Sequence, residues 1–372
     1  MNQSKASRSV AQRDPRFELL RIVAMLCILL CHVVANNGWG LEQRSGKVGV
    51  LALTVDQYAG QFGVALFFML SGYFLTRRTT MGWIHIGKVA VQTFVYSVLC
   101  LLAAVFMFNV AVAPKDIYRS ILPILNDTYW FVTAYIIMLL FAPFYNVLFN
   151  NLNRQMQFGL ILIMIALGVV PYITFMGFAY NGLQWTTAMY AVCCYCIGGY
   201  IQRHGEEICR KFNVVTELVL CMVGFCLLAA FMWAAANQVA LARFFEWQPR
   251  SLFGSIPIFA IAGAAGLLLL TTRCPYSGKY GISSRAICFW APLTFGIYLI
   301  HQQPVLLSPL WNMVGDVFPY PGSATSGIMV MFIEVIILFI SLGLISWVIE
   351  AVCVIPLHRL LSRCNGSWRR TS

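Results

Sequence analysis

Charged side chains are scarce in this sequence. Only 10% of its 372 residues are Asp, Glu, Lys or Arg, whereas 60% are hydrophobic. A soluble domain carries about 25% charged residues, which keep its surface in contact with water. This scarcity, together with a mean hydropathy of +0.77, excludes a soluble protein and predicts an all-α membrane protein that crosses the bilayer many times.

Sequence motifs for nucleic-acid binding are missing as well. The chain has no Gly-rich phosphate loop, no RNA-binding motif and no basic run interleaved with aromatic residues. Its net charge of +12 is typical of a membrane protein, because Lys and Arg gather in cytoplasmic loops. We therefore expect the lipid bilayer, and no nucleic acid, as a partner.

The thirteen cysteines do not follow the pattern of a disulfide framework or a metal site. None lies in a predicted outer loop, where disulfides form. Cys193, Cys194 and Cys196 are close in sequence, but neighbouring helical positions point about 100° apart and cannot converge on one ion. We interpret the cysteines as small buried hydrophobic residues and expect no metal.

Ten apolar stretches are long enough to cross a bilayer, which takes about 20 residues. The ninth contains Pro292, Gly296 and Pro304, which indicate a broken helix of the kind tolerated where it lines a cavity. The predicted spans are 17–38, 58–76, 89–110, 129–149, 156–175, 185–202, 214–236, 252–272, 287–308 and 327–352.

The distribution of positive charge predicts that both termini lie in the cytoplasm. In that orientation the inner segments hold roughly three Lys or Arg residues for each one in the outer loops, as the positive-inside rule requires. The polar segment 1–16 is then a retained basic cytoplasmic tail, since no small-residue cleavage site follows the first apolar run. Residues 17–352 form one polytopic bundle of about ten transmembrane helices, and 353–372 form a second basic cytoplasmic tail.

The first span carries ionisable residues along one face. Eleven residues separate Arg21 from His32, which amounts to about 20° past three full turns and a rise of roughly 16 Å. Glu18 lies about 40° to the other side of His32. Ionisable residues deep in a membrane are costly and indicate function. A snorkelling Arg21 and a His32 that only packs against a neighbour remain the structural alternatives.

Candidate residues in other spans lie at matching depths. His301 is about as far into the ninth span as His32 is into the first, so the two imidazoles predict a shared polar cavity.

Arg77 and Arg78 follow the second span at the cytoplasmic face, where paired guanidinium groups suit phosphate. Ordinary positive-inside flanking residues are the alternative for these two.

At the outer side, Trp130 opens the fourth span, where aromatic residues usually form a belt at the interface. A sugar acceptor also favours an aromatic surface beside a carboxylate, so both interpretations stay open. Glu334, in the tenth span, is a further intramembrane carboxylate whose partner the sequence does not reveal.

Several segments together resemble the acyltransferase-3 family of membrane acyltransferases. The first is the spacing from Arg21 to His32 with its lead-in Glu18-Leu19-Leu20, although Asp is commoner than Glu in the family and Gly often precedes the Arg. The others, in the family's order, are FFMLSGYFL at 67–75, YWFVTAYI at 129–136 and GIYLIH at 296–301.

This resemblance implies a single-domain surface-polysaccharide O-acetyltransferase with about ten spans in the plasma membrane, the inner membrane of a bacterium. Its donor is acyl-CoA, usually acetyl-CoA, which enters from the cytoplasm. Its acceptor is a hydroxyl of a polysaccharide or of a lipid-linked sugar. The residue that matches His32 is catalytic in the family, and the one that matches Arg21 is essential, for the donor.

The remaining candidate residues fit around this chemistry. Arg77 and Arg78, with Arg21, are expected to bind the CoA phosphates, and Glu18 to hold Arg21 by charge pairing. His32 either accepts the acyl group or deprotonates the acceptor hydroxyl. The expected acceptor-binding residues are His301, Trp130 and Tyr298.

A membrane transporter or exporter of a glycan or small substrate is the competing interpretation, because buried histidines and a broken helix also occur in transporters. The sequence shows no inverted pair of interrupted spans, which speaks against transport. Dependence on a CoA thioester discriminates between the two, since a transporter does not need one.

Overall fold

The chain folds into a bundle of helices. The computed structural model describes residues 13–41, 46–80, 82–168, 185–237, 239–240, 257–275 and 281–360, and these ranges contain helices and turns but no strand. The helices are α1 (Pro15–Asn36), α2 (Lys47–Leu75), α3 (Trp83–Phe108), α4 (Pro114–Ile121), α5 (Trp130–Asn151), α6 (Arg154–Gly168), α7 (Trp185–Lys211), α8 (Val214–Ala236), α10 (Pro257–Arg273), α11 (Ile282–Trp290), α12 (Thr294–His301), α13 (Pro304–Val317) and α14 (Ala324–Ile349).

Seven helical stretches among the described residues are long and apolar enough to cross a membrane. One of them joins α11 and α12, and another extends α14 to Leu360. The described apolar parts of α6 and α10 are shorter than a full span, and the predicted spans 156–175 and 252–272 lie partly outside the described residues. The protein is therefore an all-helical membrane protein, while the number ten stays a prediction.

The predicted start of the second span and the predicted end of the tenth differ from those of the structure. Helix α2 begins at Lys47, well before residue 58, so Asp56 and Gln57 belong to the helix and not to a loop. The last helix does not end at residue 352 but passes through a π-helical segment, Glu350–Val354, and remains helical to Leu360. At α2 the difference arises because Asp56 and Gln57 lower the hydropathy of this part of the helix without breaking it.

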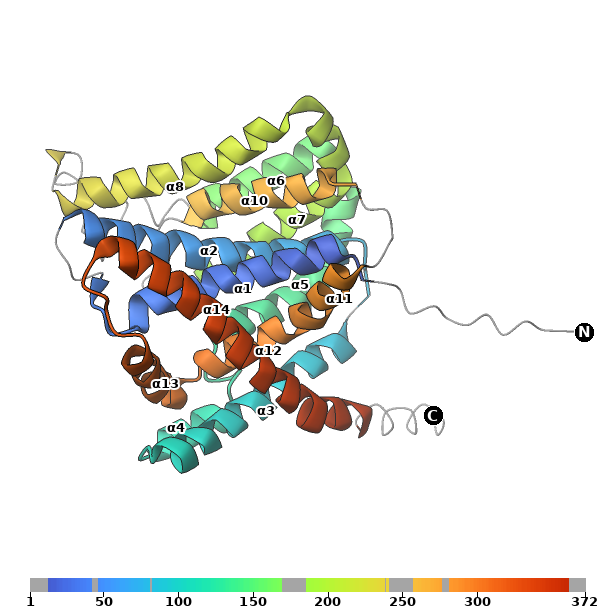
Figure 1. Cartoon of the computed structure of the whole chain (residues 1–372). Helices are drawn as coiled ribbons and strands as arrows, with labels where there is room; N and C mark the ends of the chain where they lie inside the picture. The colour runs from blue at the N-terminus through green and yellow to red at the C-terminus, as the bar shows by residue number, and fades with distance from the viewer. Residues whose placement is uncertain are drawn as a thin grey trace, which may run out of the picture.

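Helices α1 and α2 pack against each other at the centre of the bundle (Figure 1). On one side α2 contacts α7 and α10, and α8 covers α10; on the other side α14 crosses α1 and α12. Helix α1 begins and α14 ends at the same end of the bundle (Figure 1). We call this the inner end, since the sequence predicts it to be cytoplasmic, and the opposite one the outer end.

The contact between α2 and α7 is so close that it requires glycine on both sides. A Cβ atom at Gly72 would collide with the backbone oxygen of Tyr195, and one at Gly198 would collide with that of Met69. Small residues let membrane helices approach in this way. The two backbones therefore hold α7 directly against the middle of the bundle.

The ninth predicted span is broken, as its prolines indicate, but it ends earlier than residue 308. A 3₁₀ turn, Ala291–Leu293, separates α11 from α12, which ends at His301. Pro304 has no N–H group and occupies the first turn of α13, and the extended Gln303 before it caps that helix. His301 is thus the last residue of a helix that stops inside the bundle.

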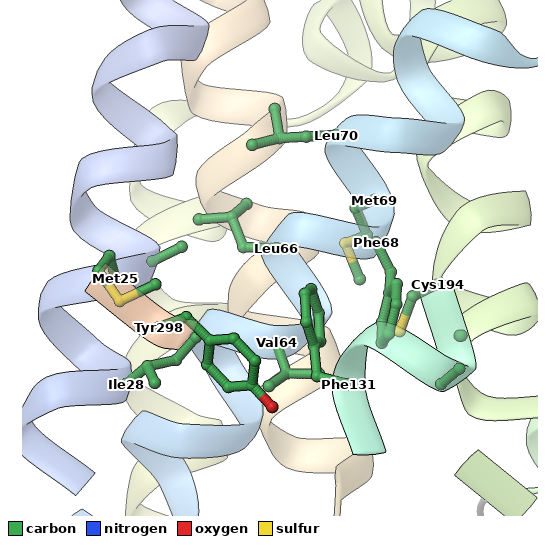
Figure 2. Packing of buried hydrophobic residues seen from close by; sticks show 14 of the residues in the cluster. Met25, Ile28, Val64, Leu66, Phe68, Met69, Leu70, Phe131, Cys194 and Tyr298 are labelled. Carbon is green, nitrogen blue, oxygen red and sulfur yellow. The ribbon is translucent and has the colours of Figure 1, made fainter. Parts of the chain in front are cut away.

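Large apolar side chains fill the centre of the bundle. Figure 2 shows Tyr298 beside Phe131, with ring centroids 5.4 Å apart, and Ile28 and Val64 close to them. These residues come from four different helices, so the same core that holds the bundle together also fixes α12 and α5 against α1 and α2.

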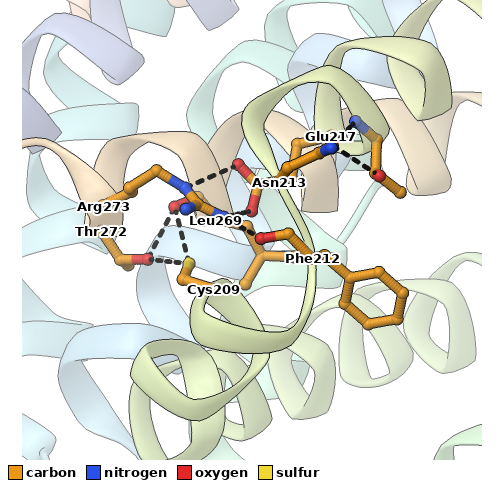
Figure 3. Close-up of polar contacts among 8 residues, drawn as sticks. Cys209, Phe212, Asn213, Glu217, Leu269, Thr272 and Arg273 are labelled. Carbon is orange, nitrogen blue, oxygen red and sulfur yellow. Dashed lines mark hydrogen bonds and ion pairs between the residues drawn. The ribbon is translucent and has the colours of Figure 1, made fainter.

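Ion pairs connect the helices at the inner end. Arg273 of α10 pairs with Glu217 of α8, with Nη2 2.7 Å from Oε1, and also donates to the backbone oxygen of Phe212 (Figure 3). Glu207, at the end of α7, accepts from Arg154 and from Lys211. The hydrogen bond from Arg154, followed by that from Lys211, lowers the pKa of Glu207 to about 2, so this carboxylate stays ionised at physiological pH.

Candidate active site

A cavity of about 1130 Å³ lies inside the bundle. It is lined by residues of α1 from Glu18 to Asn36, and thus follows this helix through most of its length. Ligand pockets commonly measure about 300–1,000 Å³, so this one can hold a large ligand or two smaller ones. Its walls come from α1, α2, α3, α5, the 3₁₀ turn before α12, α12 and α13.

Arg21 and Glu18 both line the inner part of the cavity. Nη1 of Arg21 lies 2.5 Å from Oε1 of Glu18, whose side chain is only 7% exposed. The guanidinium also lies over the ring of Phe74, 5.8 Å from its centroid. A carboxylate and an aromatic ring therefore hold Arg21 in one orientation, because both favour the cation. The predicted pairing of these two residues is present.

Of the two arginines after α2, the structure brings one to the cavity. Both side chains are exposed, but only Arg78 lines the cavity, whereas Arg77 donates from Nε to Oε1 of Gln202, 3.1 Å away. Consecutive side chains at a helix end point in different directions, so one wall cannot include both. The predicted donor-binding residue Arg77 is thus not part of this cavity.

His32 lines the same cavity, and its side chain is only partly buried. It lies on the same helix as Arg21 at a rise of roughly 16 Å. Its backbone oxygen accepts a hydrogen bond from Asn36 Nδ2 at 2.9 Å. The two residues of the predicted stripe therefore do share one cavity wall, with the histidine toward the outer end.

His301 lies behind His32 and does not line the large cavity. It is fully buried, and its ring centroid is 5.2 Å from that of His32. Its Nδ1 lies 2.6 Å from the backbone oxygen of Ile297. Because a carbonyl oxygen only accepts, Nδ1 carries the proton and Nε2 of the neutral ring is an acceptor. The predicted proximity of the two histidines is present, but His301 has no access to a ligand in the cavity.

Two aromatic candidates complete the outer part of the cavity. Tyr298 and Trp130 line it, and Trp130 is 37% exposed at the start of α5. Tyr298 is held by contacts with Tyr129 and with the ring of Phe131. Both predicted residues are therefore placed where a ligand near His32 could reach them.

Sequence reasoning missed several polar residues of the cavity. His85 lies with Nε2 3.4 Å from the hydroxyl oxygen of Tyr135, and both residues line the inner part. Asp56, Gln57 and Gln61 line the part near His32. The stretch DQYAGQ at 56–61 was the available signal, because Gln57 and Gln61 are one helical turn apart and so share a face.

Within the described ranges, no group of three or more His, Cys, Asp or Glu side chains is arranged to hold a metal ion. Glu334, the carboxylate in the tenth predicted span, is fully buried in α14 and does not line the large cavity.

The membrane-spanning helices surround one cavity, which has arginines at its inner end and a histidine deep inside. This arrangement defines a polytopic membrane protein with an internal histidine site. The chain belongs to the acyltransferase-3 family, because the family model described as an acyltransferase domain matches residues 14–351. It is therefore a membrane acyltransferase. No curated protein and no solved structure shows a significant match.

Proposed function

We propose that the protein transfers an acyl group, most simply acetyl, from cytoplasmic acyl-CoA to a hydroxyl of a surface polysaccharide or lipid-linked glycan outside the plasma membrane. The observation that carries this proposal is the shared cavity: Arg21 and Arg78 line its inner part, and His32 lines it roughly 16 Å farther along α1. In acyl-CoA the charged phosphates and the reacting thioester lie at opposite ends of one long molecule. The residues that bind the phosphates and the residue that reacts with the thioester therefore have to be separated in this way.

The inner part of the cavity supports donor binding. Arg21 and Arg78 offer guanidinium groups, which bind phosphate oxygens through paired hydrogen bonds. Glu18 keeps Arg21 in place, and one face of that guanidinium is already covered by Phe74. The CoA phosphates bind here, and the pantetheine arm extends along α1 toward His32.

His32 carries out the transfer in one of two ways. As a base, its imidazole takes the proton of the acceptor hydroxyl while the oxygen attacks the thioester carbonyl; the C–S bond breaks, an ester C–O bond forms and the proton passes to the CoA sulfur. As a nucleophile, it first takes the acyl group and releases CoA, and the hydroxyl then attacks the acyl-imidazole. Both routes have the same products, an ester and free CoA.

The test uses the purified full chain in detergent with radiolabelled acetyl-CoA and no acceptor, and it measures free CoA and protein-bound label. We expect slow CoA release from the wild type and none from His32→Ala. Label retained on the wild type supports the acyl-histidine route. His204→Ala is the matched control, because His204 lies at the inner end and bonds Gln157 outside the cavity.

Two outcomes would contradict the proposal. CoA release that persists in His32→Ala removes the histidine from the chemistry. Absence of both acetyl-CoA binding and CoA release in the wild type, repeated with succinyl-CoA, removes the thioester donor and favours a transport function.

A further inference from the structure

The polar residues of the cavity differ in charge between its two ends. Among the described lining residues, every arginine belongs to the inner part: Arg13, Arg21 and Arg78. The part around His32 is polar without any cation. Its polar lining side chains, apart from His32, are those of Cys31, Asn36, Asp56, Gln57, Gln61, Tyr298, Gln302 and Trp130.

Contacts with neighbouring residues connect this polar part of the cavity to the level of His32. Asp56 bonds Cys31, the residue before His32, and a Cβ atom at Gly60 would touch the same cysteine. Gln302 directly follows His301, whose ring packs against that of His32. Asp56 and Gln302 therefore lie next to neighbours of the two histidines, and both line the cavity that the acceptor hydroxyl has to enter.

Asp56 is the one carboxyl group among them. It is 1% exposed, its Oδ1 accepts from Cys31 Sγ at 2.9 Å and its Oδ2 accepts from Gln57 Nε2 at 2.9 Å. Both oxygens act as acceptors, as in an ionised carboxylate, which offers about four acceptor positions in all. No Lys or Arg in the described part of the chain forms an ion pair with Asp56.

An ionised carboxylate without a cation is costly to bury. Its remaining acceptor positions need hydrogen-bond donors, and sugar hydroxyl groups are donors without charge. The surrounding amides can both donate to and accept from such hydroxyls. An acidic sugar, in contrast, would bring a second carboxylate to Asp56 with no cation beside either one.

We infer that the acceptor is a neutral polyhydroxyl ring, that Asp56 holds its hydroxyl groups beside His32, and that acidic sugars are excluded. This inference rests on the proposed function and specifies the acceptor class of the same site. Donor and acceptor are thereby sorted by charge: the polyanionic CoA phosphates bind among the inner arginines, and the neutral ring binds among carboxylate and amide groups.

The test compares probes that differ only in one charged group. Methyl glucoside and methyl glucuronide form one pair, and cellobiose and cellobiouronic acid form a second. Each probe is added at high concentration to the purified full chain with acetyl-CoA, and His32-dependent CoA release and sugar ester are measured. We expect the neutral member of a pair to accelerate CoA release and to exceed its acidic partner in kcat/KM by at least about tenfold, since like charges in a binding site cost several kcal/mol.

Asp56→Asn is the decisive variant, because asparagine keeps the shape and can still accept from Cys31 but carries no charge. We expect it to raise KM for the neutral probe about tenfold, as expected from the loss of a charged hydrogen bond, and to abolish the preference over the acidic probe. Asp116→Asn makes the same change on the outer side in α4, outside the cavity lining, and keeps the preference. Acetyl-CoA binding is measured in each variant as a check of folding.

Three results overturn the inference: equal use of acidic and neutral probes by the wild type, no acceleration by any neutral probe, or a full preference retained in Asp56→Asn. Each is distinguishable from failure of the proposed function. If the proposed function itself fails, the wild type shows no His32-dependent CoA release even without a sugar.

Discussion

The rings of His32 and His301 lie with their centroids 5.2 Å apart, although the two residues come from opposite ends of the chain. His32 lines the cavity, whereas His301 is fully buried behind it and bonded to the backbone of its own helix. One imidazole is thus available to a substrate, and the other supports it from the protein side.

We expect His301→Ala to lower kcat about a hundredfold, because a misplacement of about 1 Å in a reacting group has that effect, with little change in acetyl-CoA affinity. His301→Phe keeps a ring against His32 and should recover part of the loss. Steady-state CoA release and acetyl-CoA binding separate these effects. An unchanged kcat in His301→Ala would show that His32 needs no support from this ring.

Arg78 and Arg77 offer a matched pair for the donor site, because they are adjacent and only Arg78 lines the cavity. Arg78→Gln should raise KM for acetyl-CoA tenfold to a hundredfold, as expected from a charge-assisted hydrogen bond of about 1.5–3 kcal/mol. Arg77→Gln should leave it nearly unchanged. The measurement is the dependence of CoA release on acetyl-CoA concentration, and equal effects of both substitutions would place the donor elsewhere.

Glu18 and Arg21 should act as one unit, because Glu18 holds the guanidinium at 2.5 Å. A double-mutant cycle with Glu18→Gln and Arg21→Gln, read in kcat/KM for acetyl-CoA, should give a coupling energy of about 0.5–3 kcal/mol. The second substitution then adds little to the first. Strictly additive losses would mean that Glu18 acts independently of Arg21.

Gly72→Ala should destabilise the bundle by about 1–3 kcal/mol or more, because the added methyl group meets the backbone oxygen of Tyr195, which cannot move out of the way alone. Gly159→Ala in α6 is the control, since a Cβ atom there has no neighbour within 4 Å. Thermal unfolding in detergent measures both. Equal melting temperatures would show that α2 and α7 are not in tight contact.

The helical character, the membrane location and the stripe on α1 could be predicted from the sequence. Apolar content alone excludes a soluble fold, and the periodicity of an α-helix places Arg21 and His32 on one face regardless of what surrounds them. The break after His301 is equally local, because Pro304 cannot continue the helix. Such features depend on neighbours in the chain.

The tertiary structure decided which of the candidate residues line the cavity. Arg77 and Arg78 are equivalent by composition, and only the packing of α2 against α7 turns one toward the cavity and the other toward Gln202. Asp56 lies before the predicted span 58–76, and the structure places it inside α2, which begins at Lys47. Whether a side chain contacts a ligand depends on helices from distant parts of the sequence. The sequence pattern contains the spacing of residues along each helix, but not the direction in which the neighbouring helices lie.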